Sequence, residues 1–221
     1  MKNWLKEFLI AKITREKLEK FLAKYSSENK LVLDIGCADG KYRKYFPNRI
    51  GLDIKEGKGV DVIGDAHNLP FENEKFDMVL CTEVLEHLHS PHIAISEMHR
   101  VLKKGGTLIL TTRFIFSIHD APHDYYRFTK YGLKYLLKDK WQIIEIQEEA
   151  STKDTFAILL QRVGYQTRLY GGKFTKVIIF LMARLICFLP SLIKKEIGDI
   201  GKFKEEGNIL TSGYYLACKK L

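Results

Sequence analysis

The sequence predicts an α/β fold built on a doubly wound, mostly parallel sheet of seven strands. Two observations lead to this fold class. Residues 31–33 form a short apolar run that ends in the acid Asp34, which is typical of a buried strand that delivers its carboxyl end to a ligand, and a glycine-rich turn follows after Ile35. Strand-like and helix-like segments then alternate as far as residue 150, as in sheets whose parallel strands are joined by helices. Such sheets bind ligands at the carboxyl ends of their strands.

Each element has its own local signal. Apolar runs predict strands at residues 31–35, 50–54, 60–63, 76–81, 107–112, 141–147 and 212–218. Helical spacing predicts helices at Pro91–Leu102 and Lys130–Leu137. We expect the first of these to end in a basic turn capped by Gly105 and Gly106.

Residues 1–30 precede the first strand and carry apolar side chains at helical spacing. The apolar positions are Trp4, Leu5, Phe8, Leu9, Ile13, Leu18, Phe21, Leu22 and Tyr25. Lysines and glutamates separate them, so we expect an amphipathic helix ahead of the core. The predicted organisation is this helix, a core at 31–150, a helical hydrophobic insertion at 151–211, and a final core strand at 212–221.

The insertion contains the most apolar segment of the chain. Val177–Leu189 is apolar at every position except Arg184. A helix of this run would be about 20 Å long, which is short of a hydrocarbon core of about 30 Å. We expect it to bury itself as a lid or surface helix on a membrane or lipid-like substrate through residues 173–195, or else to pack inside the protein.

Charge and cysteine content limit the partners and the compartment. The chain has a net charge of +9, but residues 31–150 hold 16 basic against 18 acidic side chains. The positive charge therefore lies at the two ends, which favours an anionic membrane surface or solvated helix faces over a nucleic acid at the core. The four cysteines form no C-x-x-C pair, and no apolar signal segment opens the chain, so we expect a cytoplasmic protein that is membrane-associated if the insertion binds lipid.

The segment Val32–Gly40 reads VLDIGCADG and resembles motif I of the class I S-adenosylmethionine (SAM) methyltransferases. Ala38 stands where that family usually has its middle glycine. The G-x-G-x-x-G spacing of dinucleotide-binding folds is absent, which argues against a dehydrogenase. Gly64–Phe71, Phe76–Cys81 and Arg100–Gly106 resemble the next motifs of the family, in the same order, and are most similar to its small-molecule branch.

The resemblance implies a Rossmann-like methyltransferase fold with SAM as its cofactor. Asp34 would orient the turn or the amine of the ligand, and the turn would offer backbone groups. Asp53, at the end of the second strand, would bind both ribose hydroxyls, and Asp65 would meet the adenine amine beside an apolar wall. The full set of predicted cofactor residues is Asp34, Gly36, Cys37, Ala38, Gly40, Asp53, Ile54, Asp65, Ala66 and Cys81.

An acidic segment with a histidine follows the fourth strand. Glu83, Glu86 and His87 have the E-x-x-E-H spacing of a divalent-metal motif in certain RNA-end and quinone O-methyltransferases. The same string also begins a helix in methyltransferases that hold no metal. We expect no metal here and keep these three residues as candidate ligands.

The loop after the fifth strand, residues 119–129, is crowded with polar and aromatic side chains. It resembles a segment of envelope-polysaccharide and lipid-pathway methyltransferases. A base in this loop would serve a hydroxyl or acidic-carbon acceptor, and the candidates are His119, His123 and Asp124. His87, which lies outside the loop, ranks after these three as a candidate base. The sequence therefore predicts a SAM-dependent methyltransferase for a small-molecule, lipid-linked or glycan acceptor. The alternatives are an RNA methyltransferase and a non-catalytic interaction module.

Overall fold

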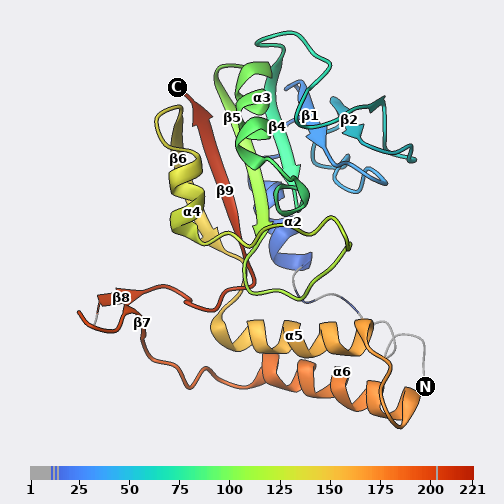
Figure 1. Cartoon of the computed structure of the whole chain (residues 1–221), viewed down its shortest axis with the longest axis vertical. Helices are drawn as coiled ribbons and strands as arrows, with labels where there is room; N and C mark the ends of the chain where they lie inside the picture. Colours follow the sequence, from blue (N-terminus) through green and yellow to red (C-terminus); the bar gives the residue numbers. More distant parts are fainter. Residues whose placement is uncertain (1–10, 12, 14, 203) are drawn as a thin grey trace. The chain divides into compact units, whose positions relative to one another are not determined.

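The computed structural model describes residues 11, 13, 15–202 and 204–221 (Figure 1). They divide into two compact units. The sheet unit comprises Glu19–Phe114, Ile118–Gln147 and Tyr214–Leu221, and the helical unit comprises Ile115–Ser117, Glu148–Gly213 and the described residues up to Leu18. The predicted four-part division of the chain stays a prediction.

The sheet has seven strands in the order β3-β2-β1-β4-β5-β9-β6. Their bounds are β1 Val32–Ile35, β2 Arg49–Asp53, β3 Val62–Ile63, β4 Phe76–Thr82, β5 Leu102–Arg113, β6 Trp141–Glu148 and β9 Gly213–Lys220. Strand β1 pairs in parallel with both β2 and β4, and β4 pairs in parallel with β5. The arrow of β9 runs opposite to that of β4 (Figure 1). The predicted doubly wound, mostly parallel, seven-stranded sheet is confirmed.

Helices cover both faces of this sheet, which is why its central strands are apolar on both sides. Alternate residues of β9 show the two faces, because successive side chains of a strand point in opposite directions. Leu216 belongs to the same buried cluster as Met98 of α3 (Pro91–Val101) and Leu133 of α4 (Lys130–Leu136). Its neighbour Tyr215 instead contacts Phe21 of α2 (Arg15–Lys24), with ring centroids 5.3 Å apart.

Only part of the segment in which the sequence predicts an N-terminal helix falls within the described residues. Of its predicted apolar positions, Trp4, Leu5, Phe8 and Leu9 lie outside the described residues. Leu18, Phe21 and Leu22, on α2, are buried, as an amphipathic helix requires.

The predicted glycine cap of α3 is wrong. The helix ends at Val101, and Leu102 already has an extended conformation. Leu102 is fully buried and pairs with Phe76 of β4, so the strand begins five residues earlier than the sequence pattern indicates. Gly105, with φ +69°, lies inside β5, where the pairing with β4 shifts register. The buried pairing of Leu102 with Phe76 therefore outweighs the local glycine signal for a helix end.

Besides the start of α2, the described residues of the helical unit form two helices and a two-stranded ribbon. They are α5 Thr152–Gln166, α6 Gly172–Phe188, β7 Glu196–Asp199 and β8 Lys204–Glu206. The helices lie side by side (Figure 1), because Gly164 of α5 leaves room for Phe180 of α6: a Cβ at Gly164 would lie 2.8 Å from that ring. The sequence pattern predicts the helical character of this segment and misses the antiparallel β7–β8 pair.

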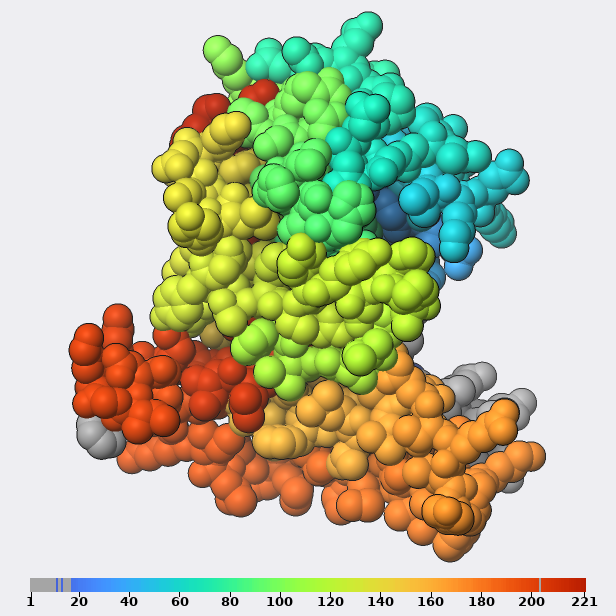
Figure 2. Space-filling view, in the orientation of Figure 1, coloured from blue at the N-terminus to red at the C-terminus, as the bar shows by residue number. Residues whose placement is uncertain are grey.

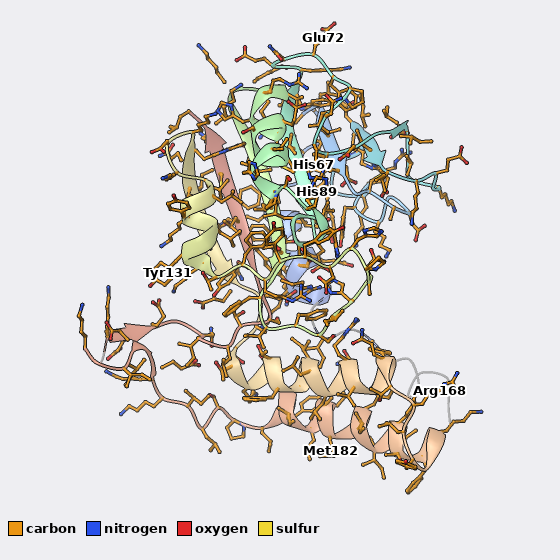
Figure 3. All side chains as sticks on the ribbon, in the orientation of Figure 1. His67, Glu72, His89, Tyr131, Arg168 and Met182 are labelled. Atoms are coloured by element: carbon orange, nitrogen blue, oxygen red, sulfur yellow. The ribbon has the colours of Figure 1, made fainter. Side chains whose placement is uncertain are left out.

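Within the described part of the chain, helix α6 does not bury its apolar surface on every side, so packing inside the protein, one of the two alternatives from sequence, covers only part of it. Phe180 and Ala183 are buried, but a stripe on one side is 40–60% exposed. The stripe consists of Ile178, Leu181, Met182, Leu185 and Leu189, and Figure 3 labels Met182 on the side of α6 away from α5. Among the described residues, no helix is long and apolar enough to cross a membrane.

Candidate functional site

The glycine turn after β1 needs backbone conformations that side chains disfavour. Gly36 and Gly40 have φ values of +68° and +67°, and a Cβ on Gly36 would lie 2.2 Å from Cγ2 of Val84. Ala38 also has a positive φ, +43°, which explains why a glycine suits this position in the sequences that it resembles. The turn therefore packs against the segment that follows β4.

Asp53 ties the end of β2 to this turn. Its Oδ2 atom accepts a hydrogen bond from the backbone N–H of Ala38 at 3.0 Å. The residue is half-buried, and a carboxylate has about four acceptor positions, so acceptor capacity remains toward solvent. Ile54, the next residue, is 67% exposed. The two residues thus line the open side of the turn.

Asp34, in contrast, lies beneath the turn. It is 1% exposed, and Nη1 of Arg49 lies 3.3 Å from its Oδ2 atom. Neither carboxylate oxygen has a hydrogen-bond partner in the described part of the chain. Burial raises the pKa of Asp34 to about 7, although Arg49 acts in the opposite direction. Its geometry fits support of the turn from within the protein.

A third carboxylate follows β3. Oδ1 of Asp65 accepts hydrogen bonds from the backbone N–H and the Nδ1 atom of His67, at 2.9 and 2.6 Å. His67 in turn stacks on His89, with ring centroids 4.1 Å apart (Figure 3). Burial opposes ionisation of Asp65, but the hydrogen bonds from His67 outweigh it and lower its pKa. The side chain of Asp65 stays about half exposed, as an acceptor for a ligand amine would be.

Three other predicted cofactor residues turn their side chains away from solvent. Ala66 and Cys81 belong to the buried core, and burial raises the pKa of the Cys81 thiol. The thiol of Cys37 donates to the carbonyl of Gly59 at 3.3 Å. These residues can meet a ligand only through their backbone groups.

An acid and two imidazoles converge next to the turn. Glu86 is fully buried, and its Oε2 atom accepts a hydrogen bond from the hydroxyl of Thr112 at 2.7 Å. Nε2 of His119 lies 4.0 Å from the other carboxylate oxygen, Oε1. The rings of His87 and His119 lie edge to face, with centroids 4.7 Å apart.

Glu83 does not join this cluster, although the sequence spacing groups it with Glu86 and His87. It forms an ion pair with the buried Arg113 of β5. His119 takes its place, a residue for which the sequence predicts only the role of a base. No spacing rule in the sequence connects His119 to Glu86. Glu86 follows the carboxyl end of β4 and His119 that of β5, so the adjacency of these two strands is the signal that could have predicted their contact.

The three candidate bases have different surroundings. Arg127 holds Asp124 through two hydrogen bonds of 2.6 Å and lowers its pKa to about 2, despite partial burial. So acidic a group is a poor base near neutral pH. Asp124 instead accepts from the backbone N–H of His119 at 2.9 Å, which positions that residue. His123 is exposed, with Nδ1 3.1 Å from the Tyr125 hydroxyl.

The loop that carries these bases is accessible to an acceptor. Residues 118–129 form a continuous part of the visible surface, yellow-green in Figure 2. The cofactor candidates and the acid–imidazole cluster all belong to the sheet unit, and Gly36 and Val84 bring the two groups together.

Known proteins share this architecture. Residues 33–110 match a family model described as a methyltransferase domain. The tRNA (carboxymethyluridine(34)-5-O)-methyltransferase of Arabidopsis thaliana is 37% identical over 94 residues, which cover 37% of this chain and 23% of that protein. A phthiotriol/phenolphthiotriol dimycocerosates methyltransferase of Mycobacterium ulcerans is 35% identical over 102 residues, 37% of each chain.

One similar solved structure is the Burkholderia thailandensis 1,6-didemethyltoxoflavin-N1-methyltransferase, with bound 1,6-didemethyltoxoflavin and S-adenosylhomocysteine. It superposes with a TM-score of 0.58 at 13% identity, over 97% of this chain and 81% of that one, so the likeness is one of fold. The chain spans 42% to 61% of the length of the first curated relatives that it matches.

Proposed function

Residues 33–110 form a class I SAM-dependent methyltransferase domain, and on that premise we propose that the chain transfers a methyl group from SAM to a small-molecule, lipid-linked or glycan acceptor. One observation carries the proposal. The glycine turn touches Val84, at the start of the segment that holds Glu86, so a ligand on the turn and an acceptor beside His119 would meet at one edge of the sheet.

The residues around the turn fit SAM. Gly36 and Gly40 leave the turn without a Cβ, and the carboxylates of Asp53 and Asp65 flank it at the ends of β2 and β3. In the proposed arrangement Asp53 binds the ribose hydroxyls and Asp65 the adenine amine. Asp34 supports the turn from beneath. When bound, SAM supplies an electrophilic methyl group on a sulfonium.

The chain's own contribution is then to align the acceptor and to handle its proton. His119 is the candidate base that the geometry favours, since Asp124 holds its backbone and Glu86 lies beside its ring. A positive charge developing on that imidazole would be stabilised by the carboxylates on either side. His123, which is exposed, has the role of contacting the acceptor.

RNA is the main alternative acceptor, because a tRNA methyltransferase is among the relatives. Residues 31–150 hold 16 basic and 18 acidic side chains, so the core has no excess of positive charge for a phosphate backbone, which favours the smaller acceptor. A non-catalytic module that retains the fold is the second alternative.

A transfer assay on fractionated cell extract separates these functions. Extract is divided into lipid, RNA and small-molecule fractions, and each is incubated with the protein and methyl-labelled SAM. We expect label in the lipid or small-molecule fraction, and none with an Asp53→Ala variant. Salt-sensitive labelling of RNA would support the alternative acceptor. Absence of SAM binding would identify a non-catalytic module.

We also propose that the exposed stripe of α6 contacts an anionic lipid surface. Lys173 and Lys176 lie at the start of α6, and Lys194 and Lys195 lie in the segment between α6 and β7, where Lys195 also forms an ion pair with Glu205. An apolar stripe flanked by cations is the pattern of a helix that lies in the plane of a membrane interface. The comparisons with known proteins neither support nor exclude this contact.

A further inference from the structure

We infer that Glu86, His87 and His119 form a binding site for a transition-metal dication of the Zn²⁺ class. One ligand atom from each residue lies within 4.8 Å of the other two. Two of these residues follow β4 and the third follows β5, so neighbouring strands hold the set together. This set differs from the E-x-x-E-H spacing, because Glu83 is paired with Arg113 and His119 comes from another segment.

The histidines are oriented as metal-binding histidines usually are. Nδ1 of His87 lies 2.7 Å from the backbone carbonyl oxygen of His123. That oxygen can only accept, so Nδ1 carries the hydrogen and Nε2 carries the lone pair. Nδ1 of His119 lies 3.5 Å from the carboxylate of Asp124, which favours the same tautomer. An oxygen acceptor on the far nitrogen is a recurrent feature of imidazoles that bind metals.

Glu86 supplies an independent observation. The residue is fully buried, and its Oε1 atom has no hydrogen-bond partner in the part of the chain that the structure describes. Nε2 of His119, at 4.0 Å, is beyond hydrogen-bond distance from this atom. Burying a carboxylate oxygen without a partner is costly. A cation between Glu86 and the two imidazoles would remove that cost.

The donor set determines the class of ion. Two imidazole nitrogens and one carboxylate suit Zn²⁺ and its first-row neighbours, whereas Mg²⁺ and Ca²⁺ prefer oxygen ligands. Ligand atoms on one tetrahedral Zn²⁺ lie about 3.4 Å apart. The three side chains would therefore close in by small rotations, and a fourth position would stay open toward the accessible loop.

Such a site changes the role of His119 in the proposed function. A nitrogen that binds the ion cannot also accept the acceptor's proton. An acceptor hydroxyl bound at the open position would instead become more acidic through the ion itself. The ion-binding proposal rests on the cluster alone and does not need methyl transfer to be correct.

Titration with the metal alone tests the site. Purified, chelator-treated full-length protein is titrated with Zn²⁺ by calorimetry, and with Co²⁺ while the visible absorption of the bound ion is recorded. SAM is left out, so failure of the proposed methyl transfer does not affect the result. We expect one ion per chain and an affinity at least tenfold lower in His119→Ala and Glu86→Gln. His92→Ala, an exposed histidine on α3, is the matched control and should bind as the wild type does.

Circular dichroism checks that each variant is folded. His119 is partly exposed, so His119→Ala carries the test even if the buried Glu86→Gln substitution unfolds the chain. The proposal is overturned if the wild type binds no stoichiometric Zn²⁺ or Co²⁺, or if His119→Ala binds as tightly as His92→Ala. Binding of Mg²⁺ in preference to both ions would overturn the assigned class.

Discussion

Nε2 of His119 lies 4.0 Å from Oε1 of Glu86, although the two residues follow different strands of the sheet. The contact places an accessible imidazole against a fully buried carboxylate. In the proposed function, the cofactor on the glycine turn and the acceptor at the surface loop would meet here, because Gly36 of the turn packs against Val84, two residues before Glu86.

Asp53→Ala should weaken SAM binding by about 2–4 kcal/mol, because two ribose hydroxyls would lose a charged acceptor. The substitution also removes the hydrogen bond from Ala38 that ties the turn to β2. Calorimetry on the folded variant measures the loss, with Glu56→Ala, an exposed acid outside the predicted cofactor set, as the control. Equal affinities for wild type and Asp53→Ala would mean that β2 does not bind the ribose.

His119→Ala should lower turnover by about 10²- to 10⁴-fold while SAM affinity stays within twofold of the wild type, because the residue lies on the acceptor side. His123→Ala should lower turnover less, since its ring is exposed and contacts Tyr125. Steady-state kinetics and SAM titration of both variants give the comparison. Loss of SAM binding in folded His119→Ala would show that the loop belongs to the cofactor site.

Stability should fall as the pH rises from about 4 to 7, through Asp34. Burial raises the pKa of this carboxyl to about 7, above its ordinary value of 3.8, so the folded protein holds the proton more tightly than the unfolded chain does. The stabilisation is complete below pH 4 and is lost as the pH passes through 7, with a change of up to about 4 kcal/mol in the free energy of unfolding.

Urea unfolding at several pH values measures this slope. Asp34→Asn cannot titrate and should show a flatter dependence over the same range. If the wild type and Asp34→Asn have the same slope, Asp34 is ionised in the folded protein and its ion pair with Arg49 outweighs its burial.

The exposed stripe of α6 should bind anionic vesicles. In flotation assays at low salt, the wild type should rise with vesicles that contain phosphatidylserine, and Leu181→Glu/Leu185→Glu should stay at the bottom, because both side chains are about half exposed or more. Tyr170→Glu/Ile200→Glu, at two highly exposed sites outside the stripe, adds the same charge and is the control. A wild type that never floats would remove the lipid contact from the proposed function.

The sequence by itself determined the seven strands of the main sheet, apart from the start of β5, together with the glycine turn and the order of the family's motifs. These depend on short-range physics: a buried parallel strand needs an apolar run, and a turn with positive φ at Gly36 and Gly40 favours glycine. Only the tertiary structure decided that Leu102 pairs with Phe76 instead of ending a helix at Gly105. In the same way, it paired Glu83 with Arg113 and set Glu86 beside His119. These partners are far apart in the chain, and they meet only because β4 and β5 are neighbours in the folded sheet, a long-range pairing that no local spacing of residues encodes.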